Sequence, residues 1–225
     1  MGRLVRVAIV VVVLLVLADF GAKLLVQNLA ASALASRRGV NGSVDVSFGA
    51  FPFLLALKDR HFGSVTVEAG DVRSGGFATA SDVTPQTEAR LESVRFELDD
   101  VEVVGDVWRD DPKGRVSAAS GRGSATLTQE SLNGLVPPEH AAHLTLRDGA
   151  VRVTVRSQLG RQNVDVPESG VRLDASTLVV EAPEPIGAIS IPLPELVDGV
   201  TFEGVDVTSG ALELTFSLTD VELKL

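Results

Sequence analysis

The sequence predicts an α+β chain in which an apolar helix at the N-terminus precedes one domain made mostly of antiparallel strands. Three observations support this prediction: an apolar run near the start, a period-two alternation of apolar and polar residues along most of the remainder, and glycine-containing turns between the alternating segments. We expect residues 1–22 to form a signal anchor or signal peptide. Residues 23–225 are long enough for one sizeable domain and short for two.

The N-terminal apolar run, residues 4–18, carries one charge, Arg6, and follows the basic Arg3. A cleaved signal peptide has an apolar stretch of roughly 7 to 15 residues, whereas a membrane-spanning helix needs about 20. The sequence favours an uncleaved anchor, because Asp19 follows the run where a small-residue cleavage site would stand. Basic residues before such a run stay in the cytoplasm. We therefore expect the domain at the outer face of the cytoplasmic membrane, in the periplasmic space, or secreted if the segment is cleaved.

Composition excludes several classes of partner and site. The net charge is −10, and no basic patch with interleaved aromatics occurs, so we expect no nucleic-acid partner. The chain has no cysteine, which excludes disulfides and cysteine-based zinc sites. We expect no cofactor, and the domain must be held together by its hydrophobic core alone.

Alternating segments predict strands with one apolar face each. Turn residues predict two hairpins, one around Gly149 and one around Gly210, where a glycine separates two alternating segments. The clearest alternating segments are residues 44–48, 65–69, 94–98, 151–155 and 212–218.

Two segments break the period of two and predict helices. Residues 23–38 place apolar side chains near helical spacing and end at Gly39, so we expect an amphipathic helix there. Residues 128–136 begin with Thr128, a good N-cap, and stop at Pro137, so we expect a short helix between strands.

The histidines and acidic pairs offer weak candidates for chemistry. His140 and His143 follow Glu139 with a spacing that could hold a metal on one helical face, but a solvated loop after two prolines is the preferred interpretation, so we expect no metal site. The pairs 99–100 and 110–111 could serve as general acid and base or bind calcium, yet aspartates favour turns at strand ends. We therefore expect no catalytic residues.

Glycines in the segment SGRGSATL, at positions 121 and 123, suggest a nucleotide loop only weakly. The segment lacks the third glycine of a dinucleotide-binding loop and the lysine of a phosphate-binding loop. The chain also lacks the Gly-x-Ser-x-Gly motif of many hydrolases. No motif therefore favours an enzyme.

The most unusual local composition is FGAFPFLLAL, residues 48–57, which contains no charge. We interpret it as a strand, and a strand buried on both faces is the simplest interpretation. The other predicted strands have one apolar face each. A second apolar face therefore requires an apolar cover, which could be a helix, the membrane or a hydrophobic ligand.

This region of the chain resembles the LmeA-like phospholipid-binding family of actinobacterial cell-envelope proteins. The similarity extends to the N-terminal anchor with its following helix, to LTQESLNGLV, and to the closing segment that ends in VDVTSGALELTF. It spans nearly the whole chain. The residues that match the family's Phe-Pro-Phe-Leu element and its following turn and strand are Phe51, Pro52, Phe53, Leu54, Phe62, Gly63, Val65 and Val67.

The resemblance implies an exported, membrane-associated protein that binds or transfers phospholipid and supports envelope lipoglycan assembly. It also implies a long curved antiparallel sheet wrapped around a helix, as in tubular lipid-binding domains. Because alternate strand residues face opposite sides, we expect only Phe51, Phe53 and Leu55 to meet lipid directly. The candidate residues for the apolar groove are Phe48, Phe51, Phe53, Leu55, Leu57 and Phe62.

Two other functions are compatible with the sequence. The first is an anchored scaffold with a solid core, which would bind other envelope proteins or glycan-building enzymes. The second is a hydrolase or transferase that uses the scattered carboxylates. Lipids extracted from the purified protein would distinguish lipid binding from the scaffold.

Overall fold

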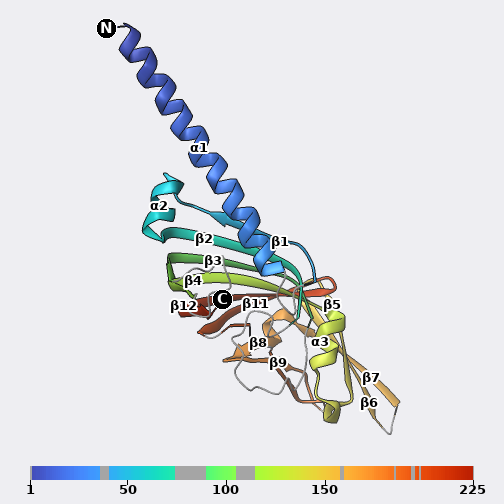
Figure 1. Cartoon of the computed structure of the whole chain (residues 1–225). Helices are drawn as coiled ribbons and strands as arrows, with labels where there is room; N and C mark the ends of the chain where they lie inside the picture. The colour runs from blue at the N-terminus through green and yellow to red at the C-terminus, as the bar shows by residue number, and fades with distance from the viewer. Residues whose placement is uncertain are drawn as a thin grey trace.

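The computed structural model describes residues 2–35, 41–73, 90–104, 115–157, 160–184, 186–193, 196–197 and 199–224. Its first element is one continuous helix, α1 (Gly2–Ala35), which projects from the body of the molecule (Figure 1). The amphipathic helix expected over residues 23–38 is therefore the C-terminal half of the apolar helix, with no break between them, while residues 36–38 lie outside the described residues. This confirms an N-terminal apolar helix.

A six-stranded antiparallel sheet forms the body of the molecule, in the order β1-β2-β3-β4-β12-β11 (Figure 1). Helix α1 contacts the edge strand β1. The large antiparallel sheet is confirmed. Its strands are β1 (Val44–Phe48), β2 (His61–Arg73), β3 (Arg90–Val104), β4 (Arg115–Thr128), β11 (Val200–Thr208) and β12 (Ala211–Lys224).

The described residues also form two three-stranded sheets, in the orders β10-β9-β8 and β5-β6-β7. The hairpins predicted around Gly149 and Gly210 join β5 to β6 and β11 to β12, and both glycines adopt positive φ, as those turns require. The strands are β5 (Ala142–Arg147), β6 (Ala150–Ser157), β7 (Gly160–Pro167), β8 (Val171–Asp174), β9 (Thr177–Glu181) and β10 (Ala188–Pro192).

The short helix predicted over residues 128–136 is confirmed as α3 (Gln129–Leu135). Thr128 caps it by accepting a hydrogen bond from the Ser131 amide at 3.3 Å. The side chain of Asn133 exchanges two hydrogen bonds with the backbone of Leu144, which attaches α3 to the edge of β5. The other short helical elements are α2 (Phe53–Asp59), η1 (Pro138–His140) and η2 (Glu168–Gly170).

The large sheet has one polar face and one apolar face, as the alternation predicts. On the polar face Glu97 accepts hydrogen bonds from Arg95 at 2.9 Å and from Arg122 at 2.8 Å, and Arg95 also pairs with Glu68, so one ladder of charges crosses β2, β3 and β4. The residues between these on each strand, such as Phe96 and Leu98, are buried on the opposite face.

Three aspartates inside the long strands interrupt the alternation. Asp71, Asp100 and Asp220 adopt positive φ, a conformation that aspartate tolerates better than most residues. Each stands between two buried residues that are three apart instead of two, for example Leu98 and Val101. The sequence-based placement of Asp99 and Asp100 at a strand end is therefore wrong, because both lie inside β3.

The phenylalanine-rich segment is not the strand that we expected. Strand β1 ends at Phe48, and the chain then forms the seven-residue helix α2, which ends at Arg60 in the left-handed conformation. Leucine, alanine and lysine favour helix. A short apolar run alone does not distinguish a buried strand from a short helix.

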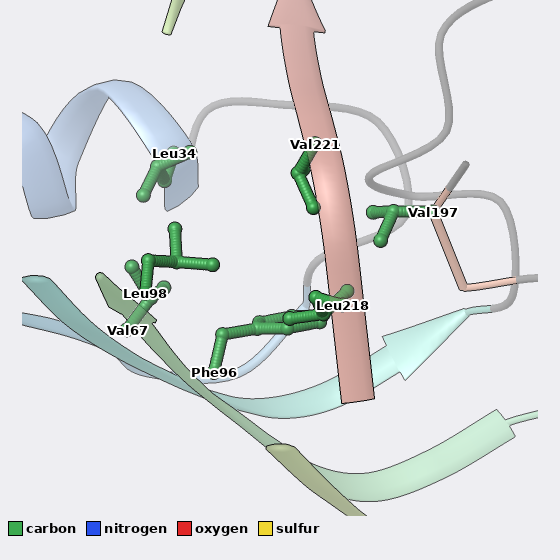
Figure 2. Close-up of a pocket in the computed structure, with 7 residues that line it drawn as sticks. All are labelled: Leu34, Val67, Phe96, Leu98, Val197, Leu218 and Val221. Carbon is green, nitrogen blue, oxygen red and sulfur yellow. The ribbon is translucent and has the colours of Figure 1, made fainter. Parts of the chain in front are cut away.

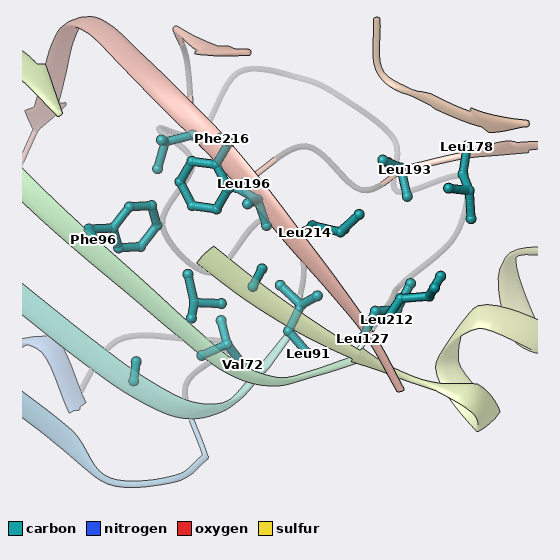
Figure 3. Close-up of a cluster of buried hydrophobic side chains, with 14 of the residues drawn as sticks. Val72, Leu91, Phe96, Leu127, Leu178, Leu193, Leu196, Leu212, Leu214 and Phe216 are labelled. Carbon is teal, nitrogen blue, oxygen red and sulfur yellow. The ribbon is translucent and has the colours of Figure 1, made fainter. Parts of the chain in front are cut away.

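The inner, apolar face of the large sheet has two covers. The sheet β8–β10, together with Leu193 and Leu196, covers one part, where buried Leu178 lies on the opposite side of the core from Leu212 and Leu127 (Figure 3). Residues near the C-terminal end of α1 pack against the core elsewhere. The candidate site lies between these two covers.

Candidate functional site

An apolar cavity lies between the end of α1 and the inner face of the large sheet. Figure 2 shows Leu34 of α1 on one side of the cavity and Val197, which precedes β11 in the chain, on another. The sheet residues lie between them. Its volume is about 40 Å³. The described residues that line it are all apolar: Leu34, Val67, Phe96, Leu98, Val197, Leu218 and Val221.

Two glycines on β4 make room for the large side chains beside the cavity. Gly123 lies between Phe96 of β3 and Phe216 of β12 in the strand register, and Gly121 lies between Leu98 and Leu218. The Phe96 and Phe216 ring centroids are 5.6 Å apart, so the rings meet above the missing side chain of Gly123. Glycines 121 and 123, which the sequence offered weakly as a nucleotide loop, are thus part of a strand.

Helix α1 approaches the cavity along one flank. The side chains on this flank recur every four residues and pack against the hydrophobic core: Ala22, Val26, Ala30 and Leu34. Leu25, on another flank, is exposed. Within the described part of the chain, α1 contains one segment, Leu14–Ser32, that is long and apolar enough to cross a membrane. The most apolar run of the sequence, residues 4–18, overlaps its start.

Asp19 connects α1 to α2. Its carboxylate accepts hydrogen bonds from the backbone N–H groups of Phe53 at 2.9 Å and Leu54 at 2.7 Å, and the residue is only 6% exposed. These amides belong to the first turn of α2, where backbone donors have no partner inside the helix and Pro52 provides no side-chain cap. A carboxylate at a helix N-terminus is also stabilised by the helix dipole.

The six residues proposed from the sequence as a groove occupy three different environments. Phe48, Phe53 and Phe62 form a buried aromatic cluster with centroids 4.9 to 5.9 Å apart, and Phe53 is 0% exposed. Leu57 is partly buried against this core.

Phe51 and Leu55, by contrast, are exposed, Phe51 at 71%. Phe51, Phe53 and Leu55 therefore do not share the cavity described above, because the helical turn of α2 points them in different directions. Phe51 and Leu55 stay available for contact with lipid outside the core.

None of the described residues around the cavity is among the six that the sequence analysis proposed as a groove. The sequence indicates these residues only when three strands are compared. The two glycines of β4 are two residues apart, as are Phe96 and Leu98 on β3 and the pair Phe216 and Leu218 on β12. Only the strand order places these three segments side by side, and the alternation of one segment does not reveal its neighbours.

The polar candidates do not assemble into a catalytic or metal site in the described residues, where no group of three or more His, Cys, Asp or Glu side chains comes together. His140 lies in η1 and His143 on β5, so the loop expected for both is only partly correct. Asp100 lies 3.0 Å from His61, and both side chains are exposed. Residues 110–111 lie outside the described residues.

Three carboxylates on the surface have pKa values that arginine neighbours lower. Hydrogen bonds from Arg122 and Arg95 lower the pKa of Glu97. Arg90 lowers the pKa of Asp71 in the same way. Arg152 does so for the third carboxylate, Asp165. All three carboxylates lie on solvent-exposed surface outside the residues that line the apolar cavity, and each pairs with an arginine of a neighbouring strand.

Comparison with known proteins adds one finding. No curated protein and no solved structure matched the chain. The profile of one protein family, described as LmeA-like phospholipid-binding, matches residues 17–217. The match takes in Asp19, both glycines of β4 and the described residues around the cavity except Leu218 and Val221. Because it covers most of the sequence, the chain belongs to the LmeA-like phospholipid-binding family.

Proposed function

We propose that this chain is an exported, non-enzymatic phospholipid-binding protein that α1 holds at the outer face of the cytoplasmic membrane. In this proposal the acyl chains enter the apolar cavity between α1 and the inner face of the large sheet. The observation that carries the proposal is the fully apolar lining of that cavity by the described residues, in a chain that belongs to a phospholipid-binding family.

The chemistry of the cavity suits an acyl chain. Burial of each methylene contributes roughly 0.8 kcal/mol, so half an acyl chain of about eight methylenes contributes roughly 6 kcal/mol without a charged partner. The described residues of the lining carry no polar side chain, so they give a headgroup nothing to bind. We therefore expect the cavity to select for acyl chains, with the headgroup outside it.

The volume of the cavity requires a movement before a lipid enters. Ligand sites typically have volumes of roughly 300 to 1,000 Å³, whereas this cavity has about 40 Å³. Leu34, in the last turn of α1, and Val197, in the connection before β11, form the walls that are not part of the sheet. We propose that these two walls separate from the sheet when lipid binds.

The small volume is also the observation that favours the alternative, an anchored scaffold with a solid core. The two functions differ in one outcome. A lipid-binding protein keeps phospholipid when the full chain is extracted in a mild detergent and purified, and a scaffold does not.

The test is mass spectrometry of lipids extracted from the purified full chain. We expect phospholipid in near-stoichiometric amount. A parallel sample of an unrelated protein with one membrane helix, purified in the same detergent, measures carry-over from the membrane. Lipid at the level of that control contradicts the proposal and supports the scaffold.

A further inference from the structure

Large exposed hydrophobic side chains are concentrated in two segments of the described structure. One segment is α1, which the proposed anchoring explains. The other is the α2 tip, which we define as Phe51, Leu54 and Leu55, with exposures of 71%, 42% and 56%. An exposed apolar cluster of this kind marks a contact with a partner or a membrane. The exposed residues of α1 are Leu14, Leu15, Val16, Leu17, Phe20, Leu24, Leu25 and Leu29.

The α2 tip is held against α1 at the position of Asp19 along the helix axis. Asp19 accepts the amide hydrogen bonds of Phe53 and Leu54, and Phe53 itself is buried between Phe48 and Phe62. These contacts attach the tip to both α1 and the sheet. Figure 1 shows α2 beside α1 at the end of the sheet from which the N-terminal half of α1 projects.

The length of α1 before Asp19 places Asp19 and the α2 tip close to the bilayer. Residues 2–18 rise about 25 Å at roughly 1.5 Å per residue, while the hydrocarbon core is about 30 Å thick. Arg3 and Arg6, which stay at the cytoplasmic side, shorten the available span further. Val26 and Ala30 of the segment Leu14–Ser32 pack against the domain core, so we take the run that begins after Arg6 as the part of α1 that crosses the membrane. This span brings Asp19, and the tip with it, to the outer leaflet.

The charges around the tip fit the same location. Residues 49–57 carry no charge, and the charged residues Lys58, Asp59 and Arg60 follow at the end of α2. Lys23 lies one helical turn after Asp19 on α1. Apolar side chains flanked by lysines match the boundary between acyl chains and phosphate headgroups. Asp19 is compatible with this depth because two amides satisfy its carboxylate.

We propose that the α2 tip inserts into the outer leaflet of the phospholipid bilayer beside α1 and forms a second membrane contact. This inference rests on the proposed membrane anchoring of the chain. Two contacts fix the tilt of the domain relative to the membrane, because tilting α1 away from the tip would pull the tip out of the lipid. The cavity then lies about 22 Å further along α1, since Leu34 follows Asp19 by fifteen residues.

The test uses the full chain in vesicles of phosphatidylcholine and phosphatidylglycerol, with one environment-sensitive fluorophore per molecule. The chain has no cysteine, so Leu55→Cys gives a single labelling site. Two exposed controls are Glu102→Cys, on β3 at the same end of the sheet, and Ser209→Cys, in the β11–β12 turn. Quenching by nitroxide-bearing lipids and by aqueous iodide reports immersion.

We expect the label at position 55 to be quenched by the lipid nitroxide and shielded from iodide, and both control labels to show the reverse. Addition of Asp19→Ala should reduce the lipid quenching at position 55, because α2 loses its attachment to α1. The proposal is overturned if iodide quenches the label at position 55 as strongly as it quenches the label at position 209. Protection from both quenchers, together with a dimer in cross-linking, assigns the tip to a second copy and also overturns it.

Lipid extraction from the same preparation separates this inference from the proposed function. Bound phospholipid with a water-exposed tip contradicts the inference alone. An immersed tip on a protein that retains no phospholipid after purification supports the inference and contradicts lipid binding in the cavity.

Discussion

Gly123 of β4 and Phe216 of β12 lie directly opposite each other, and a Cβ atom placed on Gly123 would be 2.4 Å from the Phe216 ring. The same atom would be 2.4 Å from the Arg95 carbonyl oxygen on β3. The absence of a side chain at this position therefore allows the Phe96 and Phe216 rings to approach each other beside the cavity. Glycine inside a strand commonly marks such a close approach.

Gly123→Ala should accordingly destabilise the protein. We expect a loss of about 1–3 kcal/mol in the free energy of unfolding, the usual range for overpacking. Gly134→Ala is the matched control, because nothing lies within 4 Å of the added atom and alanine favours the helix α3. Denaturant unfolding measures both. Equal stability of the two variants would show that the β4 glycines are not required for packing.

Val67→Phe should reduce lipid binding by filling the cavity. Val67 is partly buried on β2 and faces the space that we propose for the acyl chain. Val164→Phe, on a partly buried position of β7 outside the cavity, is the control. We expect both substitutions to cost up to about 3 kcal/mol. Only Val67→Phe should lower the amount of co-purified lipid, and an equal effect of both variants on lipid argues against the cavity.

Phe53→Ala should destabilise the protein strongly, whereas Phe51→Ala should leave the stability almost unchanged. Phe53 is fully buried among Phe48 and Phe62, so its truncation should cost about 3–5 kcal/mol. Phe51 is 71% exposed, and its truncation should change the stability by no more than about 0.5 kcal/mol. Thermal unfolding of both variants checks this. A small loss for Phe53→Ala would mean that the aromatic cluster is loosely packed.

Acidification should weaken the ladder of charges on the polar face. Arg122 and Arg95 lower the pKa of Glu97 in the folded protein below its ordinary value of 4.5. A carboxylate with a lowered folded pKa stabilises the protein above the unfolded pKa, and that contribution is lost as the pH falls through the folded pKa. Stability should therefore decline below about pH 4.5, and less steeply in Glu97→Gln. Identical pH profiles for the two proteins would contradict a role of Glu97.

Several elements follow from local sequence alone. Gly149 and Gly210 indicate their hairpins because type-specific turns need positive φ, and Thr128 indicates the start of α3 because its hydroxyl satisfies a free amide. The one-sided sheet follows from alternation. The N-terminal part of α1 is visible as an apolar run, although its continuity with the following helical residues is not.

Other features depend on contacts between distant segments. The left-handed aspartates, such as Asp100, shift the buried positions by one residue, and alternation cannot anticipate such a shift. The segment after Phe48 forms a helix whose first amides bind Asp19, more than thirty residues earlier. The cavity joins α1, β2, β3 and β12, so its residues become visible only once the strand order is known.

The most direct test of lipid binding in the cavity is photo-crosslinking with a phospholipid that carries a diazirine near the end of one acyl chain. The full chain is reconstituted in vesicles, irradiated, digested and mapped by mass spectrometry. We expect adducts on β3 at residues 96–98 and on β12 at residues 218–221, which line the cavity, and their loss in Val67→Phe. Adducts confined to the exposed residues of α1 and the α2 tip would contradict the account, because they would show lipid contact only at the membrane surface.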